Sequence, residues 1–132
     1  MNNSHLSSET ESFCTNHIFF IDFTDINNPV ETAIYQIPEV GSHNHWVEGD
    51  VLYAGYYYGG IRVLDISGEL LGDLYAQGRE IAFFEGRDPN GKIANETNVW
   101  GVIPYKGLIY FADHYNGLWA VKLVDDEQMG TN

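Results

Sequence analysis

The sequence predicts an all-β fold of short antiparallel strands, and three observations support this prediction. The chain has 132 residues with nine Tyr, seven Phe and three Trp against four Pro, and aromatic residues favour strands. Its 14 Gly residues separate short apolar segments at the spacing of turns between strands. Some of these segments also repeat one another. A chain of this length forms one globular domain at most.

Three segments carry the repetition most clearly. They begin at Ile18 (IFFIDF), Ile61 (IRVLDI) and Leu118 (LWAVKL), at distances of 43 and 57 residues. Repetition at a fixed period is the sequence pattern of repeat architectures. The second distance is 14 residues longer than the first, so an insertion lies between the second and third copies.

Further strands are predicted around these segments. Residues 51–55 (VLYAG) and 108–112 (LIYFA) predict the strand that forms a hairpin with the repeated segment. Before them, residues 44–46 (NHW) and 98–100 (NVW) predict another pair of matching strands. Residues 29–37 predict a fourth strand after the first segment, and we expect one in the second copy too. Four strands in a period of about 40 to 45 residues are typical of one β-propeller blade.

The insertion predicts a short helix followed by a loop. Within residues 69–85, Leu70, Leu71 and Leu74 have partial helical spacing, which two glycines weaken. Residues 86–95 have the turn chemistry of a loop. We therefore divide the chain into a polar segment at 1–16, which we expect to be disordered or a remnant, repeats at 17–39, 43–76 and 98–124, an insertion at 77–97 and an acidic tail at 125–132.

On these residues the chain resembles the LVIVD-repeat family of bacterial β-propeller proteins. The likeness is carried by residues 61–67 (IRVLDIS), 19–30 (FFIDFTDINNPV) and 44–47 (NHWV), and it covers about residues 17–124. The resemblance implies a partial β-propeller of two to three four-stranded antiparallel blades. It implies no catalytic residues, and it favours a secreted, periplasmic or cell-surface location.

Two departures from the repeat pattern bear on completeness. The first copy lacks the hairpin strand before its repeated segment, and the third has Lys122 where the others have Asp22 and Asp65. We therefore expect the C-terminal fragment of a longer propeller that ends in a terminal blade. An open set of repeats exposes apolar faces and sheet edges. We expect the remaining blades of the same propeller, or self-association into oligomers, to cover them.

Charge and composition exclude several classes of function. Six Lys and Arg against 19 Asp and Glu give a net charge of −13, which opposes binding to nucleic acid or anionic membranes. The longest apolar run, residues 108–112, is too short to span a membrane, and the N-terminus lacks the pattern of a signal peptide. Cys14 is the only cysteine, so we expect a free buried thiol, with a bridge to a partner segment as the alternative.

Several polar residues stand where they could bind a metal or hold a turn. Asp22 and Asp65 end their strands, and we expect each carboxylate to accept hydrogen bonds from the next turn rather than to act in catalysis. His43 and His45 are two residues apart, the spacing that places two imidazoles on one face of a strand. His17, His114 or a carboxylate would have to supply a third ligand. We favour hydrogen-bonding histidines, and no motif predicts a cofactor, Ca²⁺ or a transition metal.

Aromatic residues supply the other candidates. Residues 56–58 (YYY) predict an aromatic turn that covers a neighbouring blade or binds a sugar or a protein, and we expect Trp46, Trp100 and Trp119 in the core. The strands with the Asn-x-Trp pattern would line a propeller channel. The candidate ligand-binding residues are therefore His43, Asn44, His45, Asn98, Trp100, His114, Tyr56, Tyr57 and Tyr58.

These observations predict a non-catalytic binding or scaffold module. The repeats come without a nucleophile elbow of the G-x-S-x-G type, which removes support for a serine hydrolase. One alternative is a metal-dependent or hydrolytic propeller enzyme with its site at the channel mouth. The other alternative is a carbohydrate-binding propeller.

Overall fold

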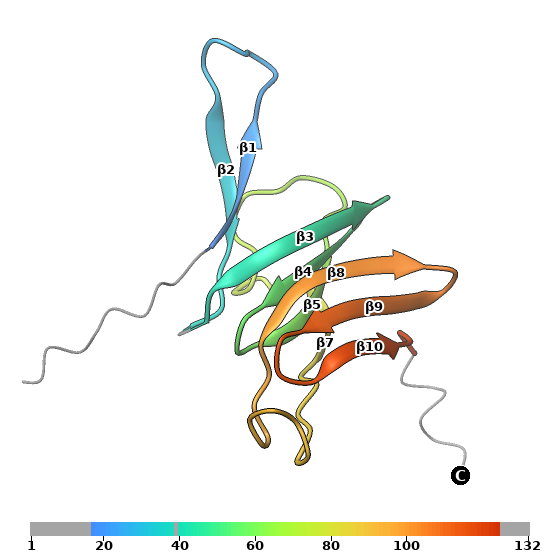
Figure 1. Ribbon diagram of the computed structural model, residues 1–132. Coiled ribbons are helices and arrows are strands. Elements are labelled where there is room, and N and C mark those ends of the chain that lie inside the picture. The colour runs from blue at the N-terminus through green and yellow to red at the C-terminus, as the bar shows by residue number, and fades with distance from the viewer. Residues whose placement is uncertain (1–16, 39, 125–132) are drawn as a thin grey trace, which may run out of the picture.

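The computed structural model describes residues 17–38 and 40–124, which form ten strands in three sheets (Figure 1). The N-terminal sheet contains β1 (Ile18–Asp22), β2 (Val30–Tyr35) and β6 (Gly72–Asp73). The middle sheet contains β3 (Ser42–Glu48), β4 (Val51–Tyr56), β5 (Gly60–Asp65) and β7 (Glu80–Phe84). The C-terminal sheet contains β8 (Val99–Tyr105), β9 (Leu108–Asp113) and β10 (Gly117–Val121). The all-β prediction is confirmed for the described residues.

The middle and C-terminal sheets share one topology. Strands β3, β4 and β5 form an antiparallel meander, and β8, β9 and β10 form another in the same order. The middle sheet continues with β7, antiparallel to β5. The N-terminal sheet is the antiparallel hairpin of β1 and β2, extended by the short parallel β6. The sequence repeat is therefore also a repeat of strand order.

The middle sheet lies between the other two and buries both of its faces (Figure 1). Its strands are apolar on both sides, as in sheets covered from both directions. On β5, for example, Leu64 packs toward the N-terminal sheet, whereas Ile61 and Val63 pack toward the C-terminal sheet. Two hydrophobic clusters result. One joins the N-terminal and middle sheets, and the other joins the middle and C-terminal sheets.

A close backbone approach joins the middle and C-terminal sheets near β3 and β8, which run side by side. A Cβ atom at Gly55 of β4 would lie 3.2 Å from Cγ1 of Val99 and 3.4 Å from the carbonyl oxygen of Asn44. The N–H of Val99 donates to the carbonyl oxygen of Tyr57 at 3.0 Å. Gly55 thus allows β4 to approach β8 more closely than a residue with a side chain would.

A buried charge connects the N-terminal and middle sheets. Arg62 of β5 donates from Nε to the carbonyl oxygen of Gly59 at 3.0 Å, and its Nη1 lies 3.4 Å from the Glu80 carboxylate. The hydroxyl of Tyr35 in β2 donates to the same carboxylate. Burial, together with the bond to Glu80, raises the pKa of Tyr35, which therefore stays a neutral donor. Pairing and hydrogen bonds make burial of the Arg62 charge tolerable.

The helix predicted within residues 69–85 is wrong. These residues form β6, a turn and β7, and no helix occurs in the described parts of the chain. Gly72 and Gly78 have φ angles of +67° and +70°, which a right-handed helix excludes. The carboxylate of Asp73 accepts the N–H groups of Tyr75 and Ala76 at 2.9 and 3.0 Å and so closes the turn instead. The periodic leucines reflect burial of Leu74 between sheets, not one face of a helix.

The prediction for the strand-terminal aspartates is confirmed. Oδ1 of Asp22 accepts the N–H of Thr24 at 2.7 Å, and Oδ1 of Asp65 accepts the N–H of Ser67 at 2.8 Å. Hydrogen bonds from the side chains of Thr24 and Ser67, together with these backbone bonds, lower the pKa of the Asp22 and Asp65 carboxyl groups, because they stabilise the ionised form. The charge of these residues therefore supports turn geometry.

The tryptophans divide between core and surface. Trp119 packs against the cluster between the middle and C-terminal sheets, as predicted. Trp46 and Trp100 are half exposed, so the prediction of a core position is wrong for both. They lie on β3 and β8, which are edge strands of their sheets and have a hydrogen-bonded neighbour along one edge only.

Some predictions concern other parts of the chain. Cys14, the polar segment at 1–16 and the tail at 125–132 lie outside the described residues. Over the described ranges, no helix has the length and apolar character needed to cross a membrane.

Candidate functional site

Four aromatic side chains meet where β3 and β8 begin, and we call them the aromatic cluster: His43, Tyr57, Trp100 and His114. The rings of His43 and Trp100 stack with centroids 5.2 Å apart and planes at 21°. His114 also stacks on the indole, at 5.3 Å and 13°. Two imidazoles therefore stack on Trp100, which stays 46% exposed.

Tyr57 closes the cluster from the side. Its ring meets His43 edge to face, with centroids 5.3 Å apart and an angle of 80°. It meets Trp100 at 6.4 Å and 87°. Edge-to-face packing is a favoured geometry for aromatic rings, because the positive ring edge meets the negative face. The cluster thus joins β3, the turn after β4, β8 and the turn after β9.

Hydrogen bonds hold the rings in place. Nδ1 of His43 lies 2.7 Å from the carbonyl oxygen of Trp100, and a carbonyl oxygen only accepts. Nδ1 therefore carries the hydrogen of this bond, and Nε2 takes no part in it. The indole Nε1 of Trp100 donates to Oδ1 of Asn98, while the backbone N–H of His114 donates to the carbonyl oxygen of Asn98 at 2.8 Å.

A buried aspartate next to the aromatic cluster holds the segments that carry two of its rings. Asp113, at the end of β9, accepts the hydroxyl of Thr97 at 2.6 Å and the N–H groups of Asn98, Tyr115 and Asn116 at 3.2, 2.8 and 3.1 Å. These bonds fix the segment before β8 and the turn that carries His114. The Asp113 carboxylate therefore has hydrogen-bond donors on several sides, as a buried carboxylate requires.

Asn116 extends this network to the long loop before β8. Its Nδ2 donates to the carbonyl oxygens of Gly86 and Glu96 at 2.7 and 2.8 Å. Thr97, Asp113 and Asn116 are not among the residues that the sequence predicted for the site. A signal for Asp113 was present, because it ends its strand just as Asp22 and Asp65 end theirs. No comparable signal marked Thr97 or Asn116.

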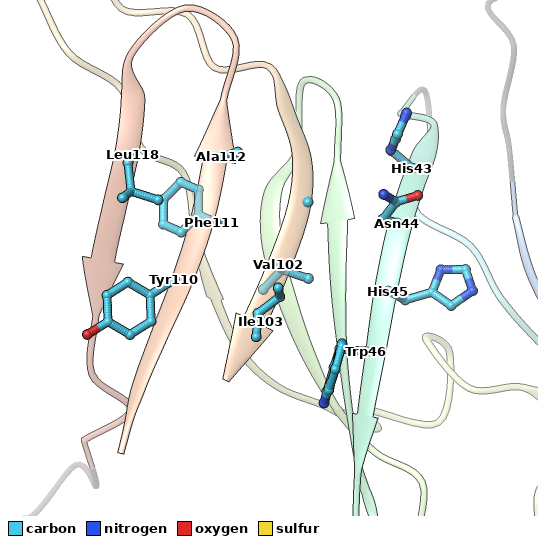
Figure 2. Close-up of a pocket in the computed structure, with 11 residues that line it drawn as sticks. His43, Asn44, His45, Trp46, Val102, Ile103, Tyr110, Phe111, Ala112 and Leu118 are labelled. Atoms are coloured by element: carbon cyan, nitrogen blue, oxygen red, sulfur yellow. The ribbon is translucent and has the colours of Figure 1, made fainter. Parts of the chain in front are cut away.

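A groove of about 510 Å³ runs beside the cluster, between β3 and the C-terminal sheet (Figure 2). In Figure 2 the ring of His45 points away from β8, whereas Trp46 lies on the side of β3 that faces β8. The register of β3 against β4 shifts between Ser42 and His45, which disturbs the regular alternation of faces. The lining residues are His43, Asn44, His45, Trp46, Gly101, Val102, Ile103, Tyr110, Phe111, Ala112 and Leu118.

The candidate metal ligands do not converge. His43 belongs to the aromatic cluster and His45 does not, and Trp100 separates His43 from His114. Across residues 17–38 and 40–124, no three His, Cys, Asp or Glu side chains are grouped as metal ligands. In His43, the intramolecular hydrogen bond engages Nδ1 and leaves Nε2 open to a ligand.

The three consecutive tyrosines occupy three different environments. Tyr56 is fully buried between the N-terminal and middle sheets, where its ring meets Tyr35 at 6.0 Å and burial raises its pKa. Tyr57 belongs to the cluster. Tyr58 is half exposed, and its hydrogen bond with Tyr115 raises its pKa. They do not form one aromatic platform.

The cluster thus offers a mixed surface of π edges, one open imidazole face and hydrogen-bonding groups. Asn98 orients the indole, and the open face belongs to His114, which is exposed. Comparison of the chain with protein-family models, curated proteins and solved structures finds no match.

Proposed function

We propose that the chain is a section of a β-propeller of the LVIVD-repeat type and acts as a non-catalytic binding module. One observation supports this proposal most strongly. The middle and C-terminal sheets contain the same three-stranded meander and pack face to face, with β3 beside β8. In this proposal they are neighbouring blades whose innermost strands are β3 and β8. The hairpin of β1 and β2 supplies the outer strands of the preceding blade.

The binding surface in this proposal is the aromatic cluster together with Tyr58 and Tyr115, which lie next to it. Tyr, Trp and His present rigid rings with polar edges, and such side chains suit protein recognition because little conformational entropy is lost on binding. The chain carries a net charge of −13, which favours a cationic partner. We therefore infer that a basic peptide segment is the ligand class.

Two observations favour a peptide over a sugar. A sugar ring stacks on an open aromatic face, yet His43 and His114 already stack on Trp100 and compete for that position. Tyr56, which could have extended an aromatic platform, is buried. A peptide, in contrast, can use the ring edges and the hydrogen-bonding groups as well as the face of His114.

The test is a selection of random 12-residue peptides displayed on phage, with binders to the Trp100→Ala variant removed at each round. We expect the remaining peptides to be enriched in Lys and Arg. We expect their dissociation constants to rise at least about tenfold for His114→Ala, as for a central interface residue. Tyr105→Ala is the matched control, because Tyr105 is an exposed aromatic residue at the other end of β8 and should leave binding unchanged.

Three results would contradict this function. Peptides that bind His114→Ala as well as the parent would place recognition elsewhere. Glycan-array binding that His114→Ala abolishes would favour the carbohydrate alternative. Stoichiometric metal in the purified protein, lost on His43→Ala, would favour the metal-dependent alternative.

A further inference from the structure

Each sheet has two faces that the sequence repeat distinguishes. Because side chains alternate along a strand, the repeated strands β1, β5 and β10 each present two sets of equivalent residues. We call one the forward face: Ile18 and Phe20 in β1, Ile61 and Val63 in β5, Leu118 and Ala120 in β10. The other is the rear face: Phe19 and Ile21, Arg62 and Leu64, Trp119 and Val121.

Within the chain, forward faces always pack on rear faces. Ile18 and Phe20 of the N-terminal sheet pack in the cluster that contains Leu64 of the middle sheet. Ile61 and Val63 of the middle sheet pack in the cluster that includes Trp119 and Val121 of the C-terminal sheet. The same relation between faces therefore occurs at two successive interfaces.

Two faces are left over, one at each end of the stack. On the forward face of the C-terminal sheet, Leu118 is 76% exposed, whereas its equivalent Ile61 is 2% exposed. On the rear face of the N-terminal sheet, Phe19 is 51% exposed, whereas its equivalent Arg62 is 8% exposed. Each open face thus has a counterpart inside the same chain that shows what kind of surface covers it.

We propose that a second copy of this chain covers the open forward face with the rear face of its own β1 and β2. This occupant repeats the forward-to-rear relation of the two internal interfaces. The open forward face is apolar beyond β10, because Ile103, Tyr110 and Ala112 lie beside Leu118 on neighbouring strands (Figure 2). The rear face offers Phe19, Ile21 and Ile34, and Ile34 pairs with Phe19.

Such a contact is head to tail. It uses different surfaces on the two copies, so it extends into a ring where the rotation closes and into an open series where it does not. None of Phe19, Ile21, Ile34, Leu118 and Ala120 belongs to the aromatic cluster, although Leu118 and His43 line the same groove. The molar mass is therefore measured without peptide, so that failure of this contact and failure of peptide binding are read separately.

The test is the molar mass in solution, measured by light scattering after size-exclusion chromatography in a reducing buffer, which prevents a disulfide through Cys14. We expect the parent to exceed the 14.9 kDa of one chain. Leu118→Asp and Phe19→Asp should each raise the dissociation constant of the contact at least about tenfold, because each places a charge in an apolar contact. Ile93→Asp, an equal charge change on an exposed loop residue, is the control and should keep the parent's mass.

Mixing the two disrupted variants identifies the geometry. Leu118→Asp keeps its rear face and Phe19→Asp keeps its forward face, so an equimolar mixture should form a heterodimer of two chains. A parent that stays at one chain mass throughout the concentration range overturns the proposal. So does an oligomer that only Leu118→Asp disrupts, because two forward faces would then meet. Intact near-ultraviolet circular dichroism of each variant shows that the fold is retained.

Discussion

At the scale of single residues, aspartates hold the turns of this acidic chain. Asp22, Asp65, Asp73 and Asp113 each accept the backbone N–H of the residue two positions later. An ionised carboxylate accepts such bonds more strongly than a neutral group. Part of the excess of acidic residues is therefore structural, which a count of charges does not reveal.

The lowered pKa values of Asp22 and Asp65 predict how stability depends on pH. A carboxyl group with a lowered pKa stabilises the fold above its unfolded pKa, about 3.9, and this contribution is lost as the pH falls through the folded pKa. We expect the free energy of unfolding to fall below about pH 4. The double change of both residues to Asn should flatten this fall, as followed by urea unfolding at each pH. If the free energy of unfolding fell equally with pH in the variant and the parent, Asp22 and Asp65 would not be the source of the pH dependence.

Asp113 should matter more than the exposed aspartates. Asp113→Ala leaves the hydroxyl of Thr97 and the N–H groups of Asn98 and Asn116 without their acceptor. Unsatisfied buried donors cost about 1–3 kcal/mol each, so we expect a loss of at least about 2 kcal/mol in the free energy of unfolding, measured with urea. Asp25→Ala, at an exposed turn, is the control and should cost about 0.5 kcal/mol or less. Equal losses for both variants would contradict the supporting role.

At the scale of elements, strand β7 explains a difference between two equivalent glycines. Gly60 and Gly117 end matching turns, with φ angles of +72° and +84°. A Cβ at Gly60 would overlap the carbonyl oxygen of Phe84 and lie 2.8 Å from the Cα of Glu85, whereas one at Gly117 meets nothing within 4 Å. Both glycines would strain the backbone when replaced, but only a side chain at Gly60 would also clash with the end of β7, the strand next to β5.

Gly60→Ala should therefore destabilise the protein more than Gly117→Ala. Strain at positive φ alone costs about 1–2 kcal/mol, which we expect for Gly117→Ala. Gly60→Ala adds a clash with backbone, so we expect a further loss of about 1–3 kcal/mol in urea unfolding. The two variants control for each other. Equal losses would mean that β7 does not lie against the start of β5.

The sequence predicted the repeated elements well and the insertion poorly, for a physical reason. Strands β3 to β5 and β8 to β10 are visible because their alternation and turns occur twice. The helix prediction failed because Leu70, Leu71 and Leu74 fit helical spacing, whereas burial of Leu74 and the positive φ of Gly72 decide the structure. Local spacing does not report such tertiary constraints.

The site was predictable in part for the same reason. The repeated Asn-x-Trp pattern pointed to Asn98 and Trp100, and the structure brings His43 and His114 to them. The stacking of the two imidazoles on one indole depends on how β3, β8 and the turn after β9 pack. That packing cannot be read from positions in the sequence. For the same reason Asn116 could not be predicted, because it donates to carbonyl oxygens of residues 20 and 30 positions earlier in the chain.

In the whole molecule, repeated sheets stack face to face. Each internal interface joins a forward face to a rear face, and the close approach at Gly55 sets β3 beside β8. The aromatic cluster exists only in that arrangement, because its rings come from both sheets. The proposed peptide site and the proposed contact between copies both follow from it.

Nuclear Overhauser contacts in solution test this arrangement most directly. They should connect the Hα atoms of Gly55 to a methyl group of Val99, which the structure places in contact, and the imidazole of His43 to the indole of Trp100. Contacts within the β4 and β5 hairpin, such as Leu52 with Leu64, serve as the control for folded strands. We predict both sets of contacts. Hairpin contacts without those between Gly55 and Val99 and between His43 and Trp100 would contradict the stacked sheets.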